Sequence, residues 1–299
     1  MPQGAPEASG GQRMTTAPAG PQQPRLSEPE LAEPLLRLAG IGKNFGPVRA
    51  LTSIDLDIPA GQVTAILGDN GAGKTTLIKC ISGIWQPDYG EMYWQGRHVR
   101  LHTPRDAAGL GIATVYQDLA LCDNLDIVQN MYLGREMTRN WQLDEINMEL
   151  TAKRTLKDLA VMSVRSIRQP VGSLSGGQRQ AVAVAKAVMR DAKLVIMDEP
   201  TAALGVTQTR VVLDLIGRLA RQGIAVIVIS HNLNDVMSVA DRLAVLYLGT
   251  LAAVGPKEQF DAQVIVDLMT TGTSRRLAGA AGDGGPDLVE QQPATGSPQ

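Results

Sequence analysis

Residues 68 to 75 read Gly68-Asp69-Asn70-Gly71-Ala72-Gly73-Lys74-Thr75, which fits the pattern G-x-x-x-x-G-K-[ST]. Glycines in such a loop let backbone N–H groups turn inward around a β-phosphate, and the helix that follows presents its positive end to the anion. An apolar run at residues 62–67 predicts a strand before the loop, and residues 74 to about 82 predict a helix after it. In that setting we expect Lys74 to reach the β- and γ-phosphates and the Thr75 hydroxyl to bind Mg²⁺. A plain glycine-rich turn would not account for this context.

A second motif, Lys193-Leu194-Val195-Ile196-Met197-Asp198-Glu199-Pro200, is an apolar run that ends in two acidic residues. The run predicts a parallel strand that is buried on both faces. Asp198 would then lie at the carboxyl edge of the sheet, beside the phosphate loop, as a ligand for Mg²⁺ and its water. Glu199 has the reach to polarise a water molecule for in-line attack on a γ-phosphorus. An acidic pair after a strand is often only a solvated strand end, but after a phosphate loop we favour the functional interpretation.

A third motif, Leu174-Ser175-Gly176-Gly177-Gln178, leads into a helical pattern at residues 179–189. A serine and two glycines at a helix start form another N-terminus that can bind an anion. One domain hardly needs two such sites for one triphosphate. The alternative is a helix cap with a tight turn, which any helix could use.

The remaining patterns predict an α/β sheet with a helical insertion. The pattern is helical between residues 119 and 190, with a heptad-like spacing at residues 148–162. The apolar stretch 243–254 is too short to span a bilayer and is interpreted as core strands. Further strands are expected at residues 51–58, 91–94, 112–115, 194–197 and 225–229.

The composition limits the class of protein. Lys and Arg residues number 28 against 30 carboxylates, for a formal net charge of −2, so we expect no polyanion-binding surface and no nucleic-acid partner. Two cysteines, Cys80 and Cys122, cannot form a disulfide framework in a chain of 299 residues and indicate a reducing compartment. Residues 1–34 and 275–299 have the composition of disordered arms, which leaves residues 35–274 as one large domain. No signal peptide or membrane span is visible, so we expect a chain that is soluble or held at a membrane through a partner.

The segment 174–178, placed between the phosphate loop and the acidic strand motif, resembles the signature of ATP-binding-cassette (ABC) ATPases. Three further residues match motifs of that family. Phe45 lies 23 positions before Gly68, where the family has an aromatic residue that stacks on adenine. Gln117 matches the glutamine that senses Mg²⁺ and the γ-phosphate, and His231 matches the switch histidine. Taken singly, each could have a purely structural role: Phe45 as a core side chain, Gln117 as a loop surface residue and His231 as a cap at a strand end.

The resemblance covers residues of about 35 to 272 and implies a fold and a site. The implied fold is a P-loop NTPase cassette of class α/β, with a mostly parallel sheet, an antiparallel β subdomain and a helical subdomain at about residues 119–190. The implied catalytic residues are Glu199, His231 and Gln117, and the implied Mg²⁺ ligands are Thr75, Gln117 and Asp198. The implied ATP-binding residues are Phe45, Gly68, Asp69, Asn70, Gly71, Ala72, Gly73, Lys74, Thr75, Thr76, Ser175, Gly176, Gly177 and Gln178.

The resemblance also implies partners. Two anion-binding helix starts suit a head-to-tail homodimer, in which each ATP lies between the phosphate loop of one chain and residues 175–178 of the other. Residues 132–136 and 201–209 resemble the ATPases of ribose- and fructose-type sugar importers. This implies a subunit at the cytoplasmic face of the inner membrane, bound to transmembrane permease subunits and working indirectly with a sugar-binding protein outside. One departure is Gly205, which stands where the family usually has an aspartate.

Other classes of protein remain as alternatives. An exporter or a non-sugar importer shares all of the nucleotide motifs and differs only in the short subfamily stretches. A chromosome-type member of the family would need a long coiled coil, but the interval from Lys74 to Ser175 has room for one helical subdomain only. A regulatory scaffold without turnover could tolerate loss of the hydrolytic residues, which are all present here.

Overall fold

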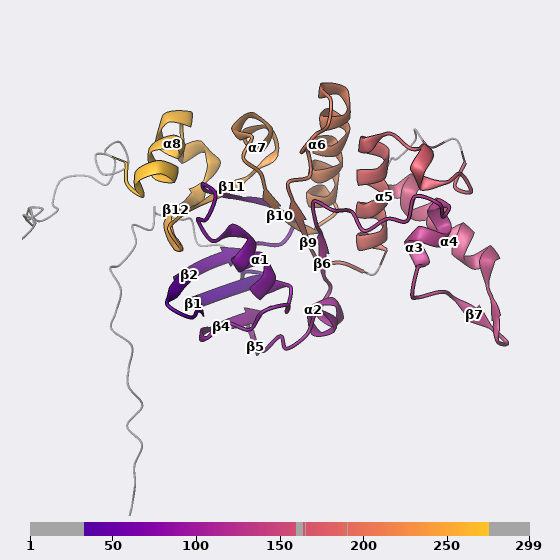
Figure 1. Ribbon diagram of the computed structural model, residues 1–299, viewed down its shortest axis with the longest axis horizontal. Helices are drawn as coiled ribbons and strands as arrows, with labels where there is room; N and C mark the ends of the chain where they lie inside the picture. The colour runs from indigo at the N-terminus through magenta and orange to yellow at the C-terminus, as the bar shows by residue number, and fades with distance from the viewer. Residues whose placement is uncertain (1–32, 160–163, 165, 190, 275–299) are drawn as a thin grey trace, which may run out of the picture.

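The central element of the protein is a six-stranded sheet with the order β12-β11-β3-β10-β9-β6. The computed structural model describes residues 33–159, 164, 166–189 and 191–274, and Figure 1 gives the arrangement of their elements. The strands from β11 to β6 run parallel, and β12 pairs antiparallel with β11 at one edge. The strands are β3 (Val63–Leu67), β6 (Ile112–Val115), β9 (Leu194–Asp198), β10 (Ala225–Ile229), β11 (Arg242–Tyr247) and β12 (Thr250–Pro256).

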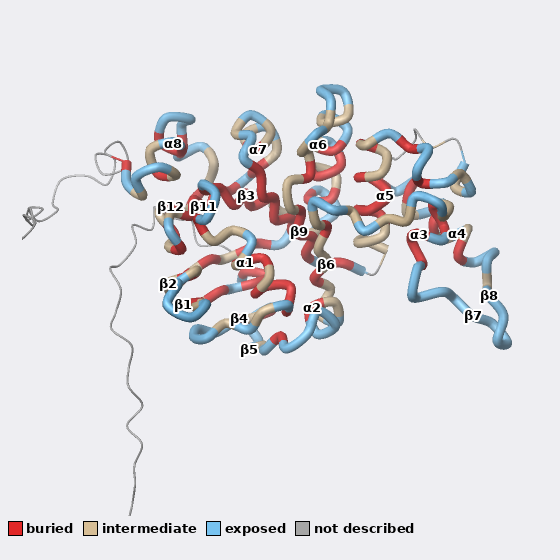
Figure 2. The backbone as a smooth tube through the Cα atoms, in the orientation of Figure 1, coloured by how far each residue is buried: buried red, intermediate tan, exposed pale blue. Residues whose placement is uncertain are grey.

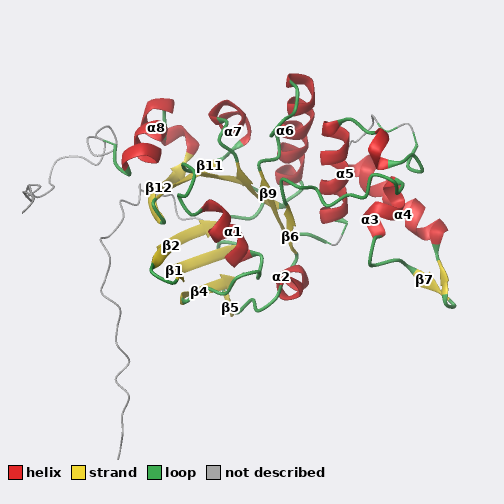
Figure 3. Ribbon diagram, in the orientation of Figure 1, coloured by secondary structure: helices red, strands yellow, loops and turns green. Residues whose placement is uncertain are grey.

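Both faces of this sheet are covered. Every residue of β3 and β10 is buried, as expected for aliphatic strands between two layers. Figure 3 shows α6 (Val206–Arg221), α7 (Leu233–Val239) and α8 (Ala262–Thr271) along one side, and α1 (Lys74–Ile81) with a second sheet on the other. Figure 2 shows the central strands as the main buried part of the chain. Successive residues of one strand therefore enter different apolar clusters, as Val195 and Ile196 of β9 do.

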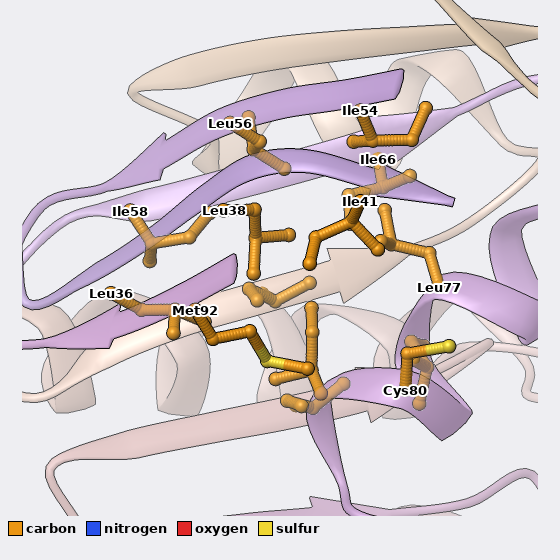
Figure 4. Packing of buried hydrophobic residues seen from close by; sticks show 14 of the residues in the cluster. Leu36, Leu38, Ile41, Ile54, Leu56, Ile58, Ile66, Leu77, Cys80 and Met92 are labelled. Atoms are coloured by element: carbon orange, nitrogen blue, oxygen red, sulfur yellow. The ribbon is translucent and has the colours of Figure 1, made fainter. Parts of the chain in front are cut away.

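The second sheet is antiparallel, with the order β2-β1-β4-β5. Its apolar face packs against α1 and the central sheet, and Figure 4 shows Ile41 and Ile54 from this sheet near Ile66 of β3 and Leu77 of α1. A tight hairpin pairs Phe45 with Val48 and places this aromatic ring at the tip of β1. The strands are β1 (Leu36–Phe45), β2 (Val48–Ile58), β4 (Tyr89–Trp94) and β5 (Arg97–Val99), and α2 (Pro104–Leu110) follows them.

The segment between β6 and β9 is mostly helical, as its pattern predicts. Its helices are α3 (Ile127–Tyr132), α4 (Glu145–Asp158) and α5 (Gly176–Val188), with a short 3-10 turn at Val171–Ser173. A two-stranded hairpin of β7 (Thr138–Arg139) and β8 (Gln142–Leu143) interrupts the helices. The purely helical interpretation was wrong here, because strands of two residues are too short to produce an alternating pattern.

The other helices and strands expected from the sequence are confirmed, and their ends differ from the expected ones by at most three residues. Strand β4 begins at Tyr89, before the expected strand at residues 91–94. Cys80 is buried and Cys122 half-buried, and both thiols are free. Among the described residues, no helix has both the length and the apolar character needed to cross a bilayer. The expected arms lie outside the described residues except for Glu33 and Pro34, and so does the end of the heptad-like segment beyond residue 159.

Candidate nucleotide-binding site

The carboxyl ends of neighbouring strands bring the site residues to one edge of the central sheet. Ile229 of β10 pairs with Ile66 of β3 on one side and with Asp198 of β9 on the other. The phosphate loop after β3, the acidic pair of β9 and His231 after β10 therefore leave the sheet side by side. Gln117 follows β6, whose Val115 pairs with β9, and is exposed at the same edge. This edge of a parallel sheet is where α/β proteins bind their ligands.

The phosphate loop is held in its shape by its lysine. The Lys74 Nζ atom donates hydrogen bonds to the carbonyl oxygens of Gly68, at 2.5 Å, and of Asp69, at 3.0 Å. Gly73 has a φ of 104°, and a Cβ atom there would lie 2.7 Å from the carbonyl oxygen of Ala50 on β2. A side chain at this position would therefore clash with the antiparallel sheet as well as strain the backbone. Two residues of the first turn of α1, Thr75 and Thr76, follow directly.

The loop leaves most of its predicted residues accessible. Asp69, Asn70, Gly71 and Thr75 are exposed, whereas Gly68 and Ala72 are buried. The start of α1 has no side-chain cap, so the backbone N–H groups of the first turn donate no hydrogen bond to a capping side chain. Free N–H groups at a helix start are suited to a phosphate.

Glu199 and His231 form a close pair at the end of β9. The Glu199 Oε2 and His231 Nδ1 atoms lie 2.8 Å apart, with the carboxyl side chain 16 % exposed and the imidazole 74 % exposed. Their orientation does not satisfy a hydrogen bond, so Oε2 is a buried acceptor without a hydrogen-bond donor in the described part of the chain. Glu199 has a φ of 50° and its N–H donates to the Ile229 carbonyl oxygen at 2.9 Å. A left-handed backbone at a non-glycine residue stores strain, which is typical of functional positions.

The charged groups at this edge perturb one another. Burial lowers the pKa of Lys74, and the charges of Glu199, Asp69 and Asp198 oppose that shift. Burial also raises the pKa of Asp198, and Glu199 adds to the rise while Lys74 opposes it. The lysine and the two carboxylates therefore share one electrostatic environment that disfavours ionised Asp198. Perturbed pKa values of this kind cluster at functional sites.

Phe45 is held by an aromatic neighbour that the sequence did not reveal. Its ring is 40 % exposed and meets the ring of Trp85 edge to face, with the centroids 4.7 Å apart. The Lys79 Nζ atom, in the last turn of α1, lies 4.4 Å from the Trp85 centroid. Trp85 is one of only three tryptophans in the chain, but no sequence pattern links it to a ring forty positions earlier. The exposed part of Phe45 is available to a flat partner such as a base.

The segment 175–178 forms the capped N-terminus of α5. Ser175 caps α5, since its Oγ atom accepts from the Gln178 N–H at 3.3 Å and the Gln178 side chain accepts from the Ser175 N–H at 2.9 Å. Cβ atoms added at Gly176 and Gly177 would meet Leu204 and Gln208, which follow the acidic motif. The serine is exposed. The second helix start is therefore accessible from outside the chain.

A phosphate loop, a strand-end acidic pair and a capped glycine-serine helix start on one α/β domain define a P-loop nucleotide-binding cassette. The family model described as "ABC transporter" matches residues 51–202, and the chain belongs to this family. The expected resemblance and fold class are thereby confirmed, and the chain is an ATP-binding-cassette ATPase by family.

Similar proteins cover almost the whole cassette. The chain is 45 % identical over 237 residues to the xylose/arabinose import ATP-binding protein XylG of Sulfolobus acidocaldarius, covering 79 % of this chain and 94 % of that protein. It is 46 % identical over 234 residues to the fructose import ATP-binding protein FrcA of Rhizobium meliloti, covering 76 % and 90 %. The solved structure of MJ1267, an ATP-binding cassette of an ABC transporter, has a TM-score of 0.70 at 28 % identity, covering 79 % and 97 %. A dimeric structure of the cassette MJ0796 bound to ADP and Pi has a TM-score of 0.61 at 25 % identity, covering 74 % and 98 %.

Proposed function

We propose that the chain is the ATP-hydrolysing subunit of an importer for a monosaccharide, and that it couples ATP binding and hydrolysis to transport through a separate permease. The observation that carries the proposal is the similarity to XylG and FrcA, at 45 % and 46 % identity over nearly their full lengths. In the proposal the cassette spans residues 35–274 and the helical subdomain about residues 119–190. The runner-up is an ABC ATPase for a non-sugar importer or an exporter, which would use the same nucleotide site.

In the proposed reaction Glu199 is the general base. Its Oε2 atom is a buried acceptor with no hydrogen-bond donor among the described residues, so it can take a proton from a water that attacks the γ-phosphorus in line. The bond from the γ-phosphorus to the β-γ bridging oxygen breaks, and ADP and phosphate leave. His231, 2.8 Å from that carboxylate, contacts the γ-phosphate. Gln117, at the same sheet edge, senses that phosphate.

The residues around the loop suit a magnesium nucleotide. The Thr75 hydroxyl, the Asp198 carboxylate and the Gln117 amide supply oxygen donors, which Mg²⁺ prefers. Bound Mg²⁺ would neutralise charge on the β- and γ-phosphates. Since burial raises the pKa of Asp198, a cation beside it would favour its ionised form. Lys74 would exchange its carbonyl partners for phosphate oxygens, and Phe45 would stack on the adenine.

A homodimer completes the proposed site. Ser175 is exposed at the start of α5, and its glycine neighbours pack against residues that follow the acidic motif. A two-fold pairing would bring residues 175–178 of one subunit onto the triphosphate held by the other and make two equivalent sites. Support comes from the dimeric cassette structure with ADP and Pi. ATP then favours the closed dimer and hydrolysis releases it.

A groove beside the helical part is the proposed docking site for the permease. It has a volume of about 330 Å³ and lies between α2, β6 and the helices α3 and α5. Residues 118–120, directly after Gln117, line it, so movement at the γ-phosphate can reach its wall. Lys186 and Arg135 give the wall two basic side chains. The permease would hold the subunit at the cytoplasmic face of the inner membrane, with a sugar-binding protein acting from the other side.

The test is co-purification of the full chain from membranes in mild detergent, followed by identification of the partner subunits. The partners should be integral membrane proteins, and ATP hydrolysis by the complex should rise with one monosaccharide and its binding protein. Stimulation by a substrate of another class would favour the runner-up. Recovery with ribosomes or chromatin would reject transport altogether.

A further inference from the structure

Exposed apolar side chains are concentrated in one short part of the helical segment. Among the described residues, fourteen large hydrophobic side chains are exposed, and six of them lie between residues 133 and 150. Trp141, at the tip of the β7–β8 hairpin, is 102 % exposed. Large exposed hydrophobic side chains that gather in one part of a chain point to an interaction site. The six are Leu133, Met137, Trp141, Leu143, Ile146 and Leu150.

The hairpin holds the Trp141 indole outward on a fixed support. Asn140 and Trp141 form a two-residue turn with φ values of 51° and 66°, which matches the twist of a short hairpin. The Asp144 N–H donates to the Met137 carbonyl oxygen at 2.8 Å, and the Met137 N–H lies 3.3 Å from the buried Met148 sulfur. The hairpin is thus tied at its base to α4. A tryptophan in a left-handed turn position is unfavourable for folding alone, since glycine is the usual residue there.

The hairpin continues from the rim of the groove proposed for the permease. Leu133 and Arg135 line that groove, and the hairpin begins with the next residues. In Figure 1 the hairpin, labelled β7, projects in the same direction as α2, and α2 forms part of the opposite groove wall. A partner that fills the groove and extends past Leu133 and Arg135 would meet the segment that leads into the hairpin.

The charge of the segment favours a protein partner over a bilayer. Residues 134–145 contain two arginines, Arg135 and Arg139, against three carboxylates, Glu136, Asp144 and Glu145. A net negative segment is not attracted to anionic lipid headgroups, which recruit basic segments. Tryptophan, methionine and arginine are instead the residue types enriched in protein interfaces.

We infer that the β7–β8 hairpin is a second contact with the permease, in which an apolar pocket on a cytoplasmic loop of the membrane subunit receives the Trp141 side chain. The inference rests on the proposed function, because it needs a permease. It adds a binding residue outside the groove and assigns a role to a segment that the nucleotide chemistry does not use.

The experiment compares the wild-type chain with Trp141→Gly, co-expressed with the permease subunits that the wild type recovers. Glycine suits a positive φ, so this variant removes the indole and keeps the turn. We expect permease recovery in detergent to fall about ten-fold or more, as for a tryptophan hot spot, with unchanged ATP hydrolysis by the subunit alone. Trp141→Phe should restore most of the recovery. Val266→Ala on α8, which removes an exposed apolar side chain at the other end of the molecule, should change nothing.

A photocrosslinking residue at position 141 identifies the occupant directly. A crosslink to a permease subunit supports the inference. A crosslink to lipid or to a second copy of the chain overturns it, and so does full permease recovery by Trp141→Gly. If the wild-type chain recovers no permease, the proposed function fails together with the inference. If the wild type recovers it and the variant matches it, only the hairpin contact fails.

Discussion

The start of α6 offers a sharp test of how the segment after the acidic motif is built. Gly205 is the N-cap of this helix, with φ −73° and ψ 160°, and it supplies no side-chain cap. These angles are open to any L-residue, and a Cβ atom at this position would meet nothing within 4 Å. Gly205→Asp therefore adds a carboxylate that can accept from the N–H of Thr207 or Gln208 without displacing a neighbour.

The expected gain can be worked from three contributions. A capping oxygen adds a few tenths of a kcal/mol over glycine, a negative charge at a helix start adds about 0.3–1 kcal/mol, and loss of glycine freedom in the unfolded chain adds about 0.4–1 kcal/mol. Together they give about 1–2 kcal/mol, because no contact is lost. For a domain of this size each kcal/mol raises Tm by about 2–4 °C.

Thermal unfolding without nucleotide measures the gain, and two matched variants divide it. Gly205→Ala keeps the backbone contribution but caps poorly, so its Tm should stay close to that of the wild type. Gly205→Asn caps without charge and should lie between Ala and Asp, with the Asn–Asp gap shrinking at high salt. A Gly205→Asp variant less stable than Gly205→Ala would refute the reasoning, since it would mean that the helix start is not open as described.

Three further predictions concern the nucleotide site. Glu199→Gln should lower hydrolysis roughly 10²- to 10⁴-fold and spare ATP binding; single-turnover assays check this, and retained turnover would reject Glu199 as base. Lys74→Ala should weaken ATP binding by about 10²-fold or more, because charge-assisted hydrogen bonds to phosphate contribute about 1.5–3 kcal/mol each; calorimetry that finds wild-type affinity would contradict the role. Asp198→Asn should stabilise the chain without Mg²⁺ and nucleotide at neutral pH. Burial raises the pKa of Asp198 above its ordinary value of 3.8, so the folded state holds the proton more tightly than the unfolded state. The stability of the wild type therefore falls as pH rises from the unfolded-state pKa through the folded-state pKa. The advantage of the variant should vanish below that pH window, and an advantage independent of pH would point to another cause.

Much of the site is predictable because its parts are local in sequence. The loop at residues 68–75 needs glycines at fixed offsets and a helix start directly after it, and both requirements are visible in the sequence. The strand before Asp198 is visible for the same reason, since a strand buried on both faces is a continuous apolar run. The sequence predicts the order of the strands less directly. The carboxyl ends of parallel strands share one edge of the sheet, so the phosphate loop and the acidic motif were expected to meet there, and the strand register agrees.

The contacts that escaped prediction depend on tertiary packing. Trp85 meets Phe45 only because α1 and the antiparallel sheet pack together, and no period or spacing records that. Glu199 approaches His231 from a left-handed backbone, and no sequence pattern predicts this conformation at a glutamate. The β7–β8 hairpin was missed because its strands have two residues each. The first two contacts join segments that lie far apart in the sequence, and the hairpin joins strands that are too short to form a pattern.

The two anion-binding helix starts differ in how the fold satisfies them, and this difference argues for pairing. At α1 the first turn has no side-chain cap, and Lys74 is satisfied by loop carbonyls that a phosphate can replace. At α5 Ser175 and Gln178 cap each other, so that start is stable as it stands. In the proposed dimer, the first start would carry the main affinity for the triphosphate, and the second would add contacts only to a triphosphate already bound by the partner. Such a division would make closure of the dimer depend on bound ATP.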